Sequence, residues 1–139
     1  MRPPEPGDVI RYAYLWGREA RAGRIEGVKD RPCAVVLSVV RSNEETQIVV
    51  APITHAPPGA ADEAIEIPFA TKQRLGLDDE RSFIVTTEVN VFTWPGYDIR
   101  PLKGGRIAYG ALPESITRKV IDAILARSRT RSLRQTGRD

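Results

Sequence analysis

The sequence predicts a mainly β domain, in which about five to seven short strands form a small antiparallel sheet or partly closed barrel and an amphipathic α-helix lies near the C-terminus. Two observations lead to this prediction. Short segments rich in valine and isoleucine recur along the chain, separated by turns that contain glycine, proline and charged residues. Strands and helices do not alternate in the way that a parallel sheet requires, so we expect antiparallel strands.

The first part of the chain contains two predicted strands and a long loop. Residues 7–15 carry apolar side chains at both odd and even positions, which indicates a strand with both faces partly covered. Residues 16–30 combine glycine with many charges and lack an apolar period, which predicts a long mobile loop. Pro32 cannot donate a ladder hydrogen bond and therefore belongs at the start of the next strand, 32–40. Arg31 is thus placed at the mouth of that strand.

The rest of the chain adds further strands and the helix. The predicted elements are a buried strand at 46–53, a short edge strand at 63–69, one or two helical turns at 70–77 that Gly76 ends, a strand at 82–94 and a weaker strand at 106–109. Pro113 and Glu114 are typical of a helix start. The apolar positions that follow have helical spacing: Ile116, Val120, Ile121, Ile124 and Leu125.

Length and charge favour one domain with a basic tail. The chain has 139 residues, of which 41% are hydrophobic, and this suits a single domain over residues 1–126. Residues 127–139 hold five arginines and one acidic residue, and either contact nucleic acid or form a solvated, poorly ordered end. No apolar run is long enough to cross a membrane, and the N-terminus lacks the apolar stretch of a secretory signal. We therefore expect a cytoplasmic protein.

Several kinds of chemistry are excluded. Cys33 is the single cysteine, so neither an intramolecular disulfide nor a zinc site built on several thiolates can form. His55 is the single histidine, which excludes a histidine-rich metal site and a mechanism with two histidines. The glycine-rich nucleotide motifs are absent. We expect no metal and no cofactor.

Three polar side chains at strand ends are the candidate catalytic residues. Arg31 opens the second strand, Thr54 closes the third, and Glu88 lies among apolar neighbours in a later strand. An arginine fork binds a phosphate through two nitrogens, and a threonine hydroxyl donates to a phosphoryl oxygen. A carboxylate can accept the proton of a ribose 2′-OH. Together these groups predict a metal-free ribonuclease site.

Each candidate also has a plainer interpretation. Arg31 next to Asp30 could form only a surface ion pair. Thr54 precedes a proline-rich loop, where a hydroxyl often serves the turn, and His55 could be a solvated loop residue. Glu88 is harder to explain in this way, because an acidic side chain among apolar neighbours requires a partner.

The order of the motifs adds a resemblance. GDVI opens the first strand, RPCAVVLS forms the second, and IVVAPIT and SFIVTTEVNVFTW follow. Over roughly residues 7–126, these motifs resemble in order and spacing the MazF/PemK (Kid) family of bacterial toxins from type II toxin–antitoxin systems.

This resemblance implies an SH3-like antiparallel β-barrel that forms a homodimer, binds a cognate antitoxin and cleaves single-stranded RNA without metal. The expected reaction is attack of the 2′-OH on the adjacent phosphate, which leaves a 2′,3′-cyclic phosphate and a 5′-hydroxyl. Arg31 and Thr54 match the residues that act on the phosphate, and Glu88 matches an acidic position that serves as general base in some members. Further candidates for RNA binding are Glu19 in the first loop, His55, and the aromatic residues Trp16, Trp94 and Tyr97.

Two other functions remain open on the sequence. The gyrase-inhibiting toxins resemble the same fold, and such a protein would depend on its C-terminal residues rather than on Arg31. A non-catalytic nucleic-acid-binding barrel would bind RNA in a strongly salt-dependent way and leave it uncut.

Overall fold

The structure is a computed structural model and describes residues 2–25, 29–96 and 98–138. Within these ranges it is mainly β, as predicted. The strands are β1 (Asp8–Tyr12), β2 (Arg31–Val40), β3 (Thr46–Thr54), β4 (Ala64–Glu66), β5 (Phe83–Val85), β6 (Glu88–Trp94), β7 (Ala108–Ala111) and β8 (Arg134–Gly137). The α-helices are α1 (Gly17–Arg21), α2 (Phe69–Leu75) and α3 (Glu114–Arg129).

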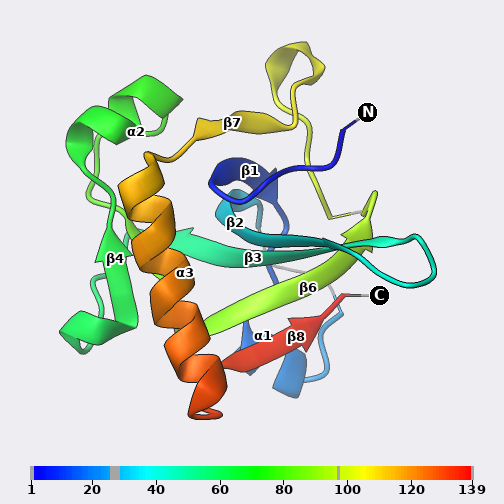
Figure 1. Cartoon of the computed structure of the whole chain (residues 1–139). Coiled ribbons are helices and arrows are strands. Elements are labelled where there is room, and N and C mark those ends of the chain that lie inside the picture. The colour runs from blue at the N-terminus through cyan, green and yellow to red at the C-terminus, as the bar shows by residue number, and fades with distance from the viewer. Residues whose placement is uncertain (1, 26–28, 97, 139) are drawn as a thin grey trace.

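The strands form one open sheet in the described part of the chain (Figure 1). Its main path runs β4-β5-β3-β2-β1-β7, and β6 pairs with β3 and β8. All pairs are antiparallel except β6 with β8, which is parallel. The described strands number eight, more than expected, because the segment predicted as one strand at 82–94 is divided and the C-terminal tail adds a strand.

The division of that segment has a cause in the pairing register. Ile53 of β3 pairs with Ile84 of β5, whereas Val50 of β3 pairs with Asn90 of β6. An interval of three residues in β3 is therefore matched by an interval of six residues in the segment that contains β5 and β6. The extra residues cannot remain in the ladder, so the chain leaves the sheet between β5 and β6.

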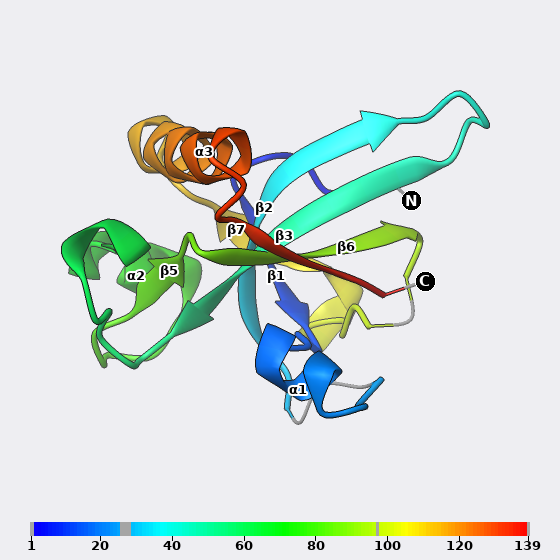
Figure 2. The same cartoon turned by 90° about the horizontal axis from the view of Figure 1, so that it is seen from below.

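Both faces of the sheet are covered by apolar side chains, as the first strand predicted. Val9 and Ala34 belong to one core cluster, and their neighbours Ile10 and Cys33 belong to another. The predicted C-terminal helix is confirmed as α3, whose buried residues pack in the first cluster. Seen from below, α3 and α1 lie on opposite sides of the sheet (Figure 2). The short α1 occupies part of the segment expected to be loop throughout.

The basic C-terminal segment is ordered into the fold through residue 138. Its strand β8 lies beside β6, with Glu88 opposite Arg134 (Figure 1). The side chain of Arg138 is 2% exposed and forms an ion pair of 2.8 Å with Asp98. It also donates to the backbone oxygen of Ala13 at 2.7 Å. These contacts explain why a polar, arginine-rich segment packs against the sheet instead of remaining a solvated tail.

Helix α2 and the single cysteine agree with what the sequence predicts for them. Helix α2 ends at Gly76, which has a φ of 73° in the left-handed region, as the sequence predicted. Cys33 is buried, and burial raises the pKa of its thiol. In the described ranges, the helices are all too short or too polar to span a membrane.

Candidate functional site

The pairing of β2 with β3 brings two predicted site residues together. The antiparallel register places Cys33 opposite Pro52, and two residues further along this register Arg31 lies beside Thr54. A tight antiparallel pair necessarily puts the first residue of one strand next to the last residue of the other. The proximity of Arg31 and Thr54 thus follows from the hairpin that the sequence predicted.

Arg31 and Thr54 line an open cavity of about 450 Å³, which we call the Arg31 cavity. His55 lines it as the first residue after β3, and Lys29 precedes β2 on its wall. Asp78 enters the cavity from the segment after α2. The cavity therefore combines two cations, an imidazole, the carboxylates of Asp78 and Asp30, and the hydroxyl groups of Thr54, Ser82 and Tyr109.

Arg31 does not form the ion pair with Asp30 that was one interpretation of the sequence. In the structure, Asp30 pairs with Arg11 at 3.6 Å and with Arg100 at 3.4 Å. The Nη1 atom of Arg31 donates to the backbone oxygen of Ile53 at 3.4 Å, while its Nε atom is buried and has no partner in the described part of the chain. A buried donor without a partner costs free energy, so the guanidinium group is incompletely satisfied in this arrangement.

Trp16 connects the Arg31 cavity to a second one. The ring of Trp16 lies 5.0 Å from the guanidinium carbon of Arg31 and 5.0 Å from that of Arg18. A smaller cavity of about 290 Å³ is lined by both groups, and Arg31 and Lys29 line the two cavities in common. Glu19 also lines the smaller cavity and accepts a hydrogen bond from the backbone of Trp16 at 3.0 Å. The structure therefore places Trp16 and Glu19 next to Arg31, and their role in RNA binding stays a prediction.

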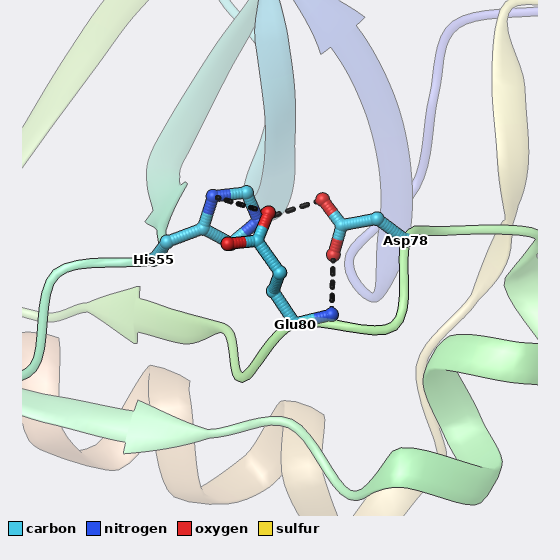
Figure 3. Close-up of side chains that lie close together, drawn as sticks. All are labelled: His55, Asp78 and Glu80. Atoms are coloured by element: carbon cyan, nitrogen blue, oxygen red, sulfur yellow. Dashed lines mark hydrogen bonds and ion pairs between the residues drawn. The ribbon is translucent and has the colours of Figure 1, made fainter.

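His55 belongs to a cluster of charged side chains (Figure 3). Its Nε2 atom lies 2.7 Å from the Oδ2 atom of Asp78, and its Nδ1 atom lies 3.7 Å from the Oε2 atom of Glu80. The buried ammonium group of Lys72 donates to Oδ1 of Asp78 at 2.6 Å and also to the backbone oxygen of Glu80. The hydrogen bond from Lys72, followed by that from His55, holds the pKa of Asp78 below its ordinary value.

The same cluster contains the described side chains that are best placed to hold a metal ion. The ligand atoms of His55, Asp78 and Glu80 lie within 4.8 Å of one another, and all three residues are exposed. His55 and Asp78 already bond with each other, and Asp78 bonds with Lys72, so the proximity of these side chains is explained without a metal ion. The prediction that the protein needs no metal stays a prediction.

Glu88 lies elsewhere. It begins β6, and its buried carboxylate accepts hydrogen bonds from the hydroxyl group of Tyr14 at 3.2 Å and from the backbone of Gly17 at 2.8 Å. Burial, and then the charge of Glu88, raises the pKa of Tyr14, so this phenol remains a donor. Glu88 is not among the residues that line the Arg31 cavity. The buried carboxylate of Glu88 thus has the hydrogen-bond partners that we expected from its apolar surroundings. Its role as general base stays a prediction.

Trp94, a further aromatic candidate, is not part of the Arg31 cavity. Trp94 pairs with Thr46 at the start of β3, whereas Thr54 ends that strand. The whole length of β3 thus separates Trp94 from the cavity, and its ring packs at the edge of a core cluster. Tyr97 lies outside the described residues.

Three residues near the site had no signal in the sequence. Lys29 lies in a segment with many charged residues, so its charge alone does not single it out. Asp78 is adjacent to the equally acidic Asp79. Lys72 lies on the predicted helical turn and is 2% exposed only because its ammonium group has two acceptors. These positions depend on how α2 packs, which no local pattern encodes.

A comparison of the chain with models of known protein families finds no match, and a comparison with curated proteins finds none either. The motifs of the sequence and the geometry of the Arg31 cavity are therefore the basis for a functional proposal.

Proposed function

We propose that the protein is a metal-independent endoribonuclease that cleaves single-stranded RNA, with the SH3-like fold of the MazF/PemK toxins. In this proposal it is the toxin of a type II toxin–antitoxin system, acts in the cytoplasm as a homodimer and is neutralised by a cognate antitoxin. One observation carries the proposal. Arg31 and Thr54, which match the phosphate-binding positions of those toxins, line one open cavity.

The arrangement of Arg31 suits a phosphate. Its guanidinium group is held by the backbone of Ile53 on one side and by the ring of Trp16 on the other, so little side-chain entropy is lost on binding. The part of the guanidinium group that lines the cavity would donate to the phosphoryl oxygens. Its fixed positive charge would stabilise the negative charge that builds on the phosphate during attack by the 2′-oxygen.

Thr54 provides a second donor. Its hydroxyl oxygen accepts a hydrogen bond from the backbone of Ala56 at 3.2 Å. A hydroxyl group can donate while it accepts, so the hydrogen of Thr54 is available to a phosphoryl oxygen. Arg31 and Thr54 together would fix the scissile phosphate between them.

The two cavities that share Arg31 and Lys29 suit the nucleotides on either side of that phosphate. A base in the smaller cavity would meet the half-exposed ring of Trp16, and stacking on an aromatic ring is a common way to bind an unpaired base. The side chain of Lys29 would contribute charge to the backbone of the RNA on both sides.

The test is incubation of the purified protein with a long single-stranded RNA of mixed sequence in the presence of EDTA. We expect cleavage at a limited set of sequences, with 2′,3′-cyclic phosphate and 5′-hydroxyl ends. Arg31→Ala should abolish cleavage, whereas Arg118→Ala should not, because Arg118 lies on α3 and pairs only with Glu114 among the described side chains. RNA that stays intact with the wild-type protein would contradict the proposal.

A further assay separates the two other functions. Inhibition of DNA supercoiling by gyrase, with RNA left uncut, would identify a gyrase poison. RNA binding that weakens steeply with salt, again without cleavage, would identify a non-catalytic binding protein.

A further inference from the structure

We propose that His55 is the proton acceptor of this reaction and that Asp78 orients it. The inference rests on the proposed function and assigns to its site a catalytic residue that the family resemblance does not supply. His55 and Asp78 line the same cavity as Arg31 and Thr54, whereas Glu88 faces Tyr14 and the backbone of Gly17. The Arg31 cavity therefore contains its own base.

The contact with Asp78 determines which nitrogen of the imidazole carries the hydrogen, and the other nitrogen, Nδ1, lies 3.7 Å from Oε2 of Glu80. The Nε2 atom of His55 lies 2.7 Å from Oδ2 of Asp78 (Figure 3). An ionised carboxylate can only accept a hydrogen bond, so Nε2 carries the hydrogen of the neutral ring. The lone pair is then on Nδ1, which is the atom that can accept a proton.

Lys72 keeps Asp78 in the form that this arrangement needs. Its ammonium group is 2% exposed and donates to the second oxygen of Asp78, which holds the carboxyl group ionised. The backbone of Glu80 donates to the same oxygen at 3.2 Å. With one oxygen fixed by two donors, the other remains directed at the imidazole.

Charged side chains of both signs surround the imidazole ring. Asp78 and Glu80, from the segment after α2, place two carboxylates at 2.7 Å and 3.7 Å from its nitrogens. Lys29 and Arg31 are the cations that line the same cavity. Asp30 lines the cavity as well, and Lys72 offsets part of the charge of Asp78 through its hydrogen bond. A bound phosphate would offset the charge of Arg31.

The step balances without any further reactant. Nδ1 of His55 takes the proton of the 2′-OH while the 2′-oxygen attacks the phosphorus and the bond between them forms. The bond from phosphorus to the 5′-oxygen breaks, and that oxygen leaves with the electron pair and takes a proton from water. The products are the 2′,3′-cyclic phosphate and the 5′-hydroxyl, and the imidazolium returns its proton to solvent.

The experiment measures single-turnover cleavage of an oligonucleotide that contains one mapped cut site. His55→Gln should lower the rate about 100-fold to 10,000-fold, and the decline of the rate in acid that the wild type shows should disappear. Binding of the same oligonucleotide with a 2′-deoxy sugar at the cut site should be nearly unchanged. Asp78→Asn should also slow cleavage, whereas Asp79→Asn, the same change one residue away on an exposed side chain, should not.

The possible failures are distinct. If the wild type cuts RNA and His55→Gln cuts as fast with the same pH profile, the inference is overturned and the proposed function stands. If the wild type cuts no RNA, both the inference and the proposed function are contradicted. Because His55 is the sole histidine, its ring signals in an NMR spectrum are assigned directly. Ring signals that do not respond to the bound 2′-deoxy oligonucleotide would overturn the inference even where a variant fails to fold.

Discussion

Two polar regions flank the first loop, and they differ in whether their groups are satisfied. In the first, the Glu88 cluster, Glu88 accepts from Tyr14 and Gly17, and the side chain of Asn90 bonds with the backbone of Leu15 through both of its polar atoms. Arg138 closes this cluster with a bond of 3.1 Å to Asn90. The cluster is buried and its groups have partners.

The second region is the Arg31 cavity, which is open and incompletely satisfied. The Nε atom of Arg31 lacks a partner among the described residues, the hydroxyl hydrogen of Thr54 is available, and His55 is half exposed. Both regions contain an arginine, a hydroxyl group and a carboxylate. The difference supports the proposal that the Glu88 cluster holds the fold together whereas the Arg31 cavity binds a ligand.

The largest effect on stability should come from Arg138→Ala. Removal of this buried side chain leaves Asp98 without its partner at 2.8 Å, and loss of one member of a buried ion pair costs about 3–5 kcal/mol. Urea unfolding measures the change. Arg134→Ala is the matched control, because this arginine is 58% exposed and 3.8 Å from Glu88, so its loss should cost less than about 1 kcal/mol. Equal losses in the two variants would show that β8 is not anchored by Arg138.

Glu88→Gln should have the next largest effect, again on stability. The amide keeps the shape of the side chain and one oxygen for the two donors that bond to Oε1, but it lacks the charge that strengthens both bonds. We therefore expect a loss of about 1–3 kcal/mol in the free energy of unfolding. The folded variant should still cut RNA within a few-fold of the wild-type rate. A folded variant with a 100-fold lower rate would instead support Glu88 as the general base.

Thr54→Val should have a smaller effect, and on the reaction. The substitution keeps the branched shape at the end of β3 and removes one neutral donor to the phosphate, which corresponds to about a 10-fold lower rate. Stability should change little, because the backbone of Ala56 is exposed and can bond to water. The measurement is single-turnover cleavage together with urea unfolding. A variant that loses stability but cuts RNA at the wild-type rate would show that the hydroxyl group of Thr54 serves to stabilise the turn.

The smallest effect should be a pH dependence at Asp78. Its pKa is lowered in the folded protein, first by the hydrogen bond from Lys72 and then by that from His55. A carboxyl group with a lowered pKa stabilises the fold above its unfolded pKa and loses this contribution as the pH falls through its folded pKa. The stability difference between the wild type and Asp78→Asn should therefore be present near neutral pH and vanish in acid. A difference that grows in acid would contradict the role of Lys72.

Much of the fold could be predicted because its signals are local. Pro32 marked the start of β2, Gly76 marked the end of α2, and the helical spacing after Pro113 predicted α3. The β2–β3 hairpin then predicted that Arg31 and Thr54 would be neighbours. The last strand, β8, was missed, because its polar sequence is held by contacts with residues far away in the chain.

The candidate site could be predicted only in part for the same reason. Arg31 and Thr54 are joined by a short hairpin, but Asp78 reaches His55 through the packing of α2, 23 residues further along the chain. Glu88 was predicted as a catalytic group from its unusual position in a strand. Its partners, Tyr14 and Gly17, come from a segment more than 70 residues away, and no local pattern indicates that they satisfy it.

We propose that the Arg31 cavity performs the chemistry and that the Glu88 cluster maintains the fold. The most direct test compares single-turnover RNA cleavage by Arg31→Ala and Glu88→Gln in the same EDTA buffer, with folding of both verified by circular dichroism. We predict that Arg31→Ala retains the fold and loses at least about 100-fold in rate, while Glu88→Gln keeps a rate near that of the wild type. Undiminished cleavage by Arg31→Ala would contradict the account.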